Sequence, residues 1–212
     1  LLAVAPAPLP RALSFDARLR DRAERIDGLF LEAVLQLKQA WTIDQTDPTI
    51  VSSGFDPALI LSIAPRLTLD RRDNPLNPTR GFVVSADLEL ADDFLGVLNA
   101  EKYTKATLRG SGFVPLGGRF VLGLNARWGI GTGGLAAGFR STRALALPVS
   151  ERFSLGGVSS LRGFADGGVP SRATDAFGGD HVVNWNVELR YPFLRDFDVQ
   201  GAVFIDGGQL LV

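Results

Sequence analysis

The chain is dominated by stretches in which apolar and polar residues alternate. In Arg119–Ile130 the even positions are apolar, from Phe120 to Ile130, whereas most odd positions are polar or small. A period of two puts successive side chains on opposite faces, so this pattern predicts a β-strand with one apolar face. The same pattern recurs clearly in 59–70, 82–90 and 182–191, and less regularly in 12–20, 29–41, 102–114 and 198–206. We therefore expect an all-β chain of about eight strands.

The length of the predicted strands and the place of their charges favour a membrane barrel. Most of the strands run for about 9–13 residues, whereas a tilted strand needs roughly 9–11 to cross a bilayer and soluble strands usually have about 5–6. Charges in the middle of polar faces suit a water-filled lumen wall. These charged residues are Arg66, Asp87, Arg109, Arg127 and Glu188. We predict a transmembrane antiparallel β-barrel; a soluble β-sandwich or barrel, which also alternates, is the alternative.

The connections between the predicted strands indicate an orientation. Apart from a near tie between 71–80 and 92–101, short and long connections alternate along the chain. Outer-membrane barrels have short periplasmic turns and long outer loops. The connections expected outside are therefore 42–57, 92–101 and 132–180. Three tryptophans lie on apolar faces near that end, which predicts an aromatic girdle at one membrane interface. They are Trp41, Trp128 and Trp185.

Composition and charge exclude several classes of function. The net charge of −1 argues against nucleic-acid binding, which requires a basic face. Without cysteine the chain has no thiolate metal site and no cysteine nucleophile. The only histidine is His181, and no Gly-x-Ser-x-Gly elbow accompanies it. No stretch approaches the 18 apolar residues of a spanning helix. We therefore expect neither an enzyme nor a cofactor or metal site.

Three segments carry information beyond the alternation. They are Asp70–Gly81, with two Asn-Pro pairs, Glu151–Phe164, with Gly-Gly and Leu-Arg-Gly-Phe, and the pair Val187–Phe193 and Val203–Gly208. Taken singly, the first is a stiff turn. The second is explained as a glycine-rich surface loop, and the third as two wall strands with a glycine-rich stop.

In this order and spacing the three segments resemble the superfamily of outer-membrane protein assembly insertases, the POTRA-linked barrels of the BamA and TamA type. Leu-Arg-Gly-Phe resembles the signature of their sixth extracellular loop, the Asn-Pro turn the one before their ninth strand, and Phe-Ile-Asp-Gly-Gly their thirteenth strand. The resemblance covers roughly residues 58–208, and 1–57 match only as generic strands. It implies that residues 1–212 form part of a sixteen-strand barrel and are similar to its strands six to thirteen. We therefore expect that this part does not close on itself.

The resemblance also implies a lock between a loop and the wall. In that superfamily the long loop, here 132–180, folds into the lumen, and its signature arginine contacts acidic side chains on the inner wall. Carried over, the loop lock is Arg162, Gly163 and Phe164, and its wall partners are Glu188, Phe204 and Asp206. The alternation agrees, because Glu188 lies on a polar face and Asp206 shares a face with Phe204.

The function that the resemblance implies is the assembly and insertion of outer-membrane proteins, without enzymatic activity. The implied partners are outer-membrane lipids, unfolded β-barrel client proteins, periplasmic POTRA domains and accessory subunits. The implied location is a bacterial outer membrane rather than an organellar one. Two alternatives stay open: a two-partner secretion transporter of the same superfamily, and a passive porin-like barrel.

Overall fold

The computed structural model describes residues 14–17, 28–40, 58–94, 101–133, 147–170, 178–194 and 199–211. Its eight strands are β1 (Ser14–Ala17), β2 (Leu29–Ala40), β3 (Ala58–Asp70), β4 (Gly81–Ala91), β5 (Tyr103–Gly117), β6 (Phe120–Gly133), β7 (His181–Leu194) and β8 (Val199–Leu211). A single short 3-10 turn, η2 (Val149–Glu151), is described between β6 and β7. Within the described ranges, no helix has the length and apolar character needed to cross a membrane.

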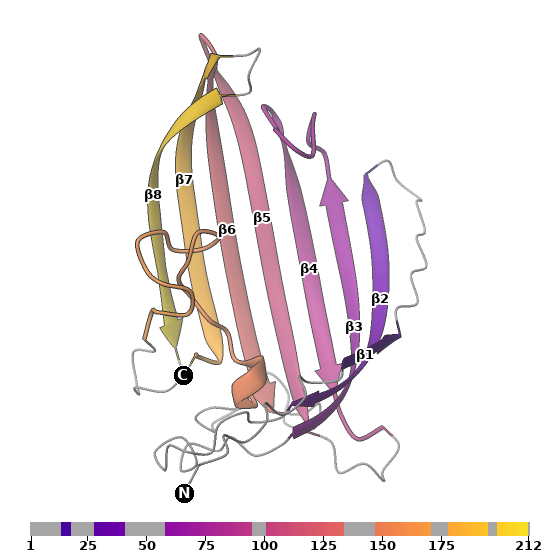
Figure 1. Cartoon of the computed structure of the whole chain (residues 1–212). Coiled ribbons are helices and arrows are strands. Elements are labelled where there is room, and N and C mark those ends of the chain that lie inside the picture. Colours follow the sequence, from indigo (N-terminus) through magenta and orange to yellow (C-terminus); the bar gives the residue numbers. More distant parts are fainter. Residues whose placement is uncertain are drawn as a thin grey trace, which may run out of the picture.

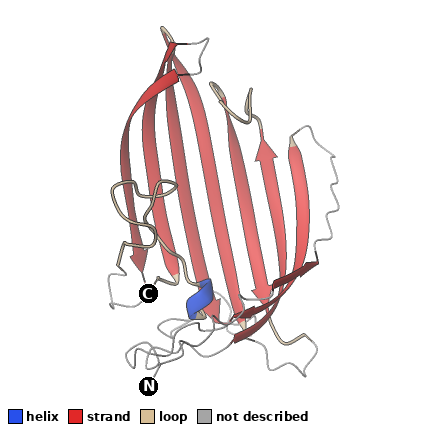
Figure 2. Ribbon diagram, viewed as in Figure 1, coloured by secondary structure: helices blue, strands red, loops and turns tan. Residues whose placement is uncertain are grey.

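All eight strands belong to one antiparallel sheet in which each strand pairs with its neighbours in the chain. The sheet curves into an open trough, seen from its concave side in Figures 1 and 2. Among the described strands no pairing joins β1 to β8, so the sheet is not closed. The prediction of an all-β, barrel-type antiparallel sheet that does not close on itself is therefore confirmed.

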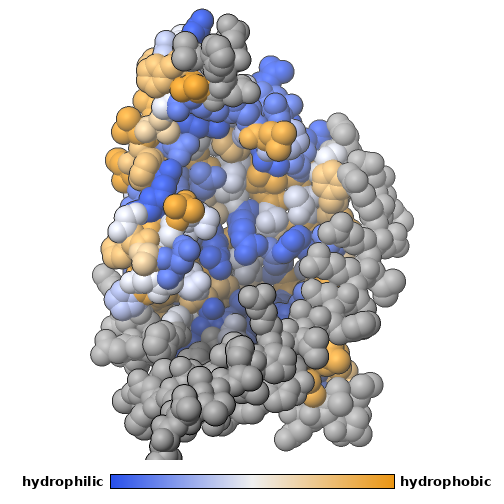
Figure 3. Space-filling view, viewed as in Figure 1, coloured by the Kyte–Doolittle hydropathy of each residue, from blue (hydrophilic) through white to orange (hydrophobic). Residues whose placement is uncertain are grey.

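The two faces of the sheet have opposite polarity. Large apolar side chains on the convex face are exposed, and Leu124 and Trp128 of β6 keep 42% and 47% of their surface. Others on this face include Leu31, Leu67, Val84, Leu108, Trp185, Leu189 and Ile205. The concave face, shown in Figure 3, is largely hydrophilic and carries the mid-strand charges predicted from the sequence. A soluble barrel would bury its apolar face, so this arrangement agrees with lipid outside and water inside.

Short turns and long connections lie at opposite ends of the sheet. The turns 71–80 and 118–119 lie at one end, and the segments that join β2 to β3, β4 to β5 and β6 to β7 leave from the other. Trp128 and Trp185 lie on the convex face toward the long-connection end. Trp41 lies outside the described residues, as does the whole of the predicted loop 42–57. The aromatic girdle therefore stays a prediction.

Several strands extend beyond their predicted bounds, and the glycine-rich stop in the last strand is wrong. The strand expected to end at 206 continues as β8 through Gly207 and Gly208 to Leu211. A Cβ at Gly207 would lie 2.5 Å from the ring of Trp185, its partner in the register. This glycine therefore makes room for a neighbouring side chain instead of ending the strand. The turn expected between the predicted strands 102–114 and 119–130 is likewise displaced, because β5 runs to Gly117 and β6 begins at Phe120.

Replacing Leu124 by arginine tests the assignment of the convex face to lipid. An arginine there would lie among lipid chains, so we expect the free energy of unfolding to fall by about 2–4 kcal/mol near the bilayer midplane. The measurement is a denaturant titration of the full-length protein in lipid vesicles. Asn125→Arg is the control, because Asn125 faces the lumen and tolerates charge. Equal losses for the two variants would contradict the assignment.

Candidate functional site

The segment 147–170 lies against the concave face of the sheet, in front of β6–β8 (Figure 1). It is held partly by apolar packing, because a small buried cluster joins the segment to the wall inside an otherwise polar lumen. The loop supplies Leu147, Phe153, Leu155 and Leu161, and the wall supplies Val182 and Leu210. Burying these side chains favours the docked loop through the hydrophobic effect.

Glycines of the wall provide the space that this cluster occupies. A Cβ at Gly129 would lie 2.7 Å from the Phe153 ring, and one at Gly131 would lie 2.3 Å from Leu147. Both distances are shorter than any allowed contact, so the loop docks only where β6 has no side chain. The sequence showed small residues on the polar face of this strand but gave no sign that they receive the loop.

The base of the loop is closed by backbone hydrogen bonds. Phe153 and Gly179 form an isolated antiparallel bridge, with an N–H···O distance of 2.9 Å in both directions. The carboxylate of Asp180 accepts the N–H of Leu147 at 3.1 Å, and its carbonyl accepts that of Gly131 at 2.7 Å. These contacts tie the two ends of the inserted segment to each other and to β6.

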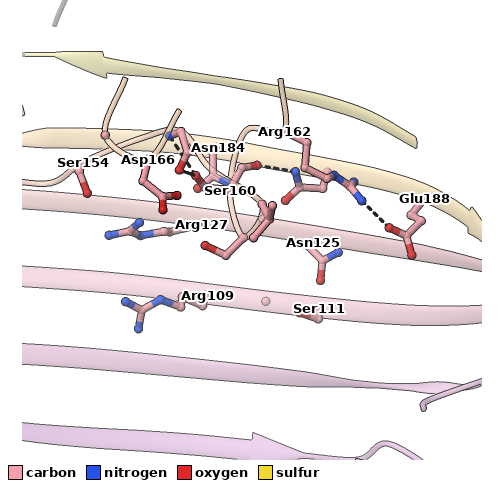
Figure 4. A pocket seen from close by; sticks show the side chains of 17 residues that line it. Arg109, Ser111, Asn125, Arg127, Ser154, Ser160, Arg162, Asp166, Asn184 and Glu188 are labelled. Carbon is pink, nitrogen blue, oxygen red and sulfur yellow. Dashed lines mark hydrogen bonds and ion pairs between the residues drawn. The ribbon is translucent and has the colours of Figure 1, made fainter. Parts of the chain in front are cut away.

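Arg162 lies at the centre of the ionic contacts between loop and wall (Figure 4). Its Nε and Nη2 donate to the two carboxylate oxygens of Asp206 at 2.8 and 2.7 Å, and its Nη1 donates to Glu188 at 2.7 Å. The backbone N–H of Arg162 also donates to Asp206, at 3.0 Å. The guanidinium carbon lies 3.4 Å from the ring centroid of Phe204. The structure thus brings together Arg162 and all three wall residues named from the sequence.

This arrangement uses the properties that distinguish arginine from lysine. The planar guanidinium engages one carboxylate bidentately, bridges to a second and stacks on an aromatic ring, which a single ammonium cannot do. The Asp206 side chain is only 4% exposed, so its charge requires a cation within the site. The hydrogen bonds to Asp206, followed by those to Glu188, hold the pKa of Arg162 above its usual range.

The rest of the signature shapes the turn that presents Arg162. Gly163 has φ +96°, in the left-handed region, and a Cβ there would meet nothing within 4 Å, so the conformation and not space selects glycine. The amide of Asn186 donates to the carbonyl of Ser160 at 2.7 Å. Phe164 is 51% exposed, and its carbonyl accepts the N–H of Gly157 at 3.0 Å. Phe164 therefore lies beside the ionic contacts and takes no part in them.

Arg190, which sequence reasoning did not single out, links the Asn-Pro turn to the same site. Its Nη2 donates to the carbonyl of Pro78 at 2.6 Å and its Nη1 to Asn77 at 3.4 Å. Its Nε lies 3.8 Å from the Glu188 carboxylate. All three sequence motifs are therefore connected through side chains on the inner wall. Its position in the sequence could have identified it, since Arg190 lies two residues from Glu188 and therefore on the same face of the strand.

The carboxylate of Asp73 makes several of the internal hydrogen bonds of the Asn-Pro turn. Asp73 accepts the hydroxyl of Thr79 and the backbone N–H groups of Asn74, Thr79 and Arg80, the last three at 2.9–3.2 Å. Gly81 closes the turn at φ +95°, where a Cβ would lie 2.1 Å from the carbonyl oxygen of Arg71. Asp73 and Gly81 thus fix the shape in which the turn meets Arg190.

Polar side chains line a cavity of about 660 Å³ between the loop and β5–β7. Figure 4 shows Arg109, Arg127, Asn125 and Asn184 around it, from three adjacent strands. Its lining suits water and polar groups. Within the described part of the chain, no group of three or more potential metal ligands is found.

The dependence of loop docking on the wall's glycines is testable with Gly131→Val. A side chain there overlaps Leu147, so we expect the loop to undock and segment 147–170 to become sensitive to protease. Gly112→Val is the matched control, because a Cβ at Gly112, on the convex face, meets nothing within 4 Å. Limited proteolysis of the folded full-length variants gives the comparison. Equal resistance of both variants would contradict the packing.

The Asn-Pro turn generates a prediction on pH. The Thr79 hydroxyl and the turn's N–H groups hold the pKa of Asp73 well below its usual range. Because the folded pKa is lower than the unfolded value of about 3.9, Asp73 stabilises the turn above that pH, and this contribution is lost as the pH falls through the folded pKa. We expect the Thr79 amide proton, followed by NMR, to titrate with a midpoint below 3.9. Asp73→Asn should remove the transition, and a midpoint at or above 3.9 would refute the explanation.

Comparisons with known proteins agree with this geometry. Residues 31–211 match the Omp85 superfamily domain. The chain is 30% identical over 152 residues to the outer membrane protein assembly factor BamA of Neisseria meningitidis, covering 66% of this chain and 17% of that protein. It is 29% identical over 133 residues to a SAM50-like protein of Schizosaccharomyces pombe, covering 62% of this chain and 26% of that protein.

The fold is similar to that of a solved relative. The crystal structure of BamA from Haemophilus ducreyi lacking POTRA domains 1–3 superimposes with a TM-score of 0.66 at 18% identity, over 88% of this chain and 40% of that one. The chain therefore spans well under half the length of these relatives. The family model matches residues 31–211, and an inserted loop is held to the inner wall of an open β-barrel sheet, so the chain belongs to the Omp85 superfamily.

Proposed function

We propose that the barrel containing this chain assembles and inserts other outer-membrane proteins. The proposal is supported by membership of the Omp85 superfamily and by similarity to a relative named as an outer membrane protein assembly factor. The observation that carries it is the docking of Arg162 between Asp206 and Glu188. A passive porin-like barrel requires no such attachment of a loop to two adjacent wall strands.

The role of the described residues in this function is mechanical. Arg162 connects the loop to β7 through Glu188 and to β8 through Asp206, and so fixes the curvature of that part of the wall. In this role the residues catalyse no reaction. The single histidine and the absence of cysteine support a role without enzymatic chemistry or a bound cofactor.

The proposed partners are outer-membrane lipids on the convex face and unfolded β-barrel clients, with POTRA domains and accessory subunits belonging to the complete protein. We place that protein in a bacterial outer membrane. Separation of inner and outer membranes by density, followed by detection of the full-length protein, tests the location.

Substitutions at Arg162 test the proposed function. We expect Arg162→Ala to lower the melting temperature and slow client assembly, Arg162→Glu to be worse because it adds a third acid, and Arg162→Lys to recover only part of the loss. Removing one partner of a buried pair typically costs about 3–5 kcal/mol, and water in the lumen reduces this cost. The measurements are heat-modifiability on gels and the rate at which the full-length protein folds a β-barrel client into liposomes.

Arg80→Ala is the control for this series, since Arg80 lies in the exposed Asn-Pro turn. Normal client assembly by Arg162→Glu would refute the proposal that the docked loop serves assembly. If the wild-type protein translocates a soluble polypeptide across the liposome membrane without inserting clients, the result would favour a secretion transporter. If it conducts ions but neither inserts clients nor translocates the polypeptide, the result would favour the passive barrel.

A further inference from the structure

A second ionic cluster joins the inserted loop to the other half of the sheet. Glu151, the last residue of η2, lies where the loop turns inward from the rim of the barrel. Its carboxylate lies 3.3 Å from the ammonium of Lys38 in β2 and 3.6 Å from that of Lys105 in β5. The Lys105 ammonium also donates to the backbone carbonyl of Glu151 at 2.6 Å. The acid is thus bracketed by cations from two strands that are not neighbours.

The cluster is completed by a second acid on the wall. Glu89 of β4 lies 3.4 Å from the Lys38 ammonium and accepts the hydroxyls of Tyr103 and Ser62, each at 2.9 Å. Two lysines and two glutamates balance in charge, so the cluster is neutral as a whole. Ser62 comes from β3 and Tyr103 from β5, so four consecutive strands, β2 to β5, contribute to it.

Burial makes this cluster more than a surface ion pair. The side chain of Glu151 is 11% exposed and that of Lys105 is 19% exposed, so each depends on its partner for stabilisation of its charge. Lys105 also lies 4.9 Å from the ring centroid of Phe153, which belongs to the apolar cluster of the loop. The position of Glu151 is therefore coupled to the packing of the loop's buried residues.

We propose that Glu151 is a second anchor of the inserted loop, opposite in charge to Arg162, and that it positions the loop against β2–β5. Arg162 fixes the inner part of the loop to β7 and β8, whereas Glu151 fixes the part near the rim to the other side of the trough. The cluster around Glu151 includes side chains of β2 to β5, Arg162 contacts β7 and β8, and β6 receives Phe153 and Leu147. One segment of chain is therefore connected to strands β2 to β8. This proposal goes beyond the proposed function and does not depend on what the complete barrel inserts or transports.

If the two anchors are separate, removing one of them should mobilise only the part of the loop that it holds. The chain is free of cysteine, so single cysteines can be introduced for spin labelling in the full-length protein, with any other cysteine replaced. Ser150→Cys reports on the Glu151 anchor and Val158→Cys on the Arg162 anchor. Both positions are exposed, so the labels do not displace packed side chains.

The experiment records the electron paramagnetic resonance spectrum of each label in the wild-type background, in four test variants and in one control variant. In Glu151→Gln we expect the mobile component to rise for the label at position 150 and to stay unchanged at position 158. In Arg162→Gln we expect the reverse. Lys105→Met should reproduce the effect of Glu151→Gln, and Lys38→Met, which removes the more exposed lysine, should give a smaller change in the same direction.

Glu101→Gln is the matched control, because Glu101 is an exposed acid at the same end of the barrel and its loss should move neither label. The proposal is overturned if Glu151→Gln leaves the label at 150 immobile, or if Glu151→Gln mobilises both labels equally. The second result would mean a single cooperative attachment. Should Glu151→Gln fail to fold, the two lysine variants decide by the same criteria. None of these readouts requires client assembly, so failure of the anchor and failure of the proposed function are distinguishable.

Discussion

The position of the inserted loop depends on one buried carboxylate. Asp206 lies on the inner face of β8 with only 4% of its side chain exposed, where an unpaired negative charge is strongly disfavoured. Arg162 satisfies it with two side-chain hydrogen bonds and a backbone N–H, stacks on Phe204 and extends to Glu188 on the neighbouring strand. Because Glu188 lies on β7 and Asp206 on β8, Arg162 reaches both acids only when the two strands are paired in this register.

The two faces of the sheet are suited to different surroundings. Apolar side chains on the convex face suit lipid, and charged ones on the concave face suit water. The loop is the exception, since it carries Leu147, Phe153 and Leu155 into a polar lumen. Glycines on the inner wall accommodate them. Charge and packing thus act together: apolar side chains dock where the wall is bare, and Arg162 with its acids fixes the docked position.

Much of this fold follows from the sequence, because a period of two reports directly which face a side chain occupies. The contacts of Arg162 with Asp206 and Glu188 were predictable from the family resemblance and from that same alternation. Gly207 was misjudged as a strand end, and the receiving role of Gly131 and the contacts of Arg190 and Glu151 were missed. The contacts of these four residues depend on the pairing register of the strands or on the position of a loop that is distant in sequence. The local pattern of apolar and polar residues predicts neither.

A double-mutant cycle between Arg162 and Asp206 tests the central claim most directly. The free energy of unfolding of the full-length protein would be measured for Arg162→Gln, Asp206→Asn and the double variant, with the more exposed pair Lys102 and Asp92, 3.0 Å apart, as reference. The account predicts a favourable coupling energy well above the roughly 0.2–1 kcal/mol of a surface pair. Losses that add to within about 0.3–0.5 kcal/mol would contradict it, because independent sites behave in that way.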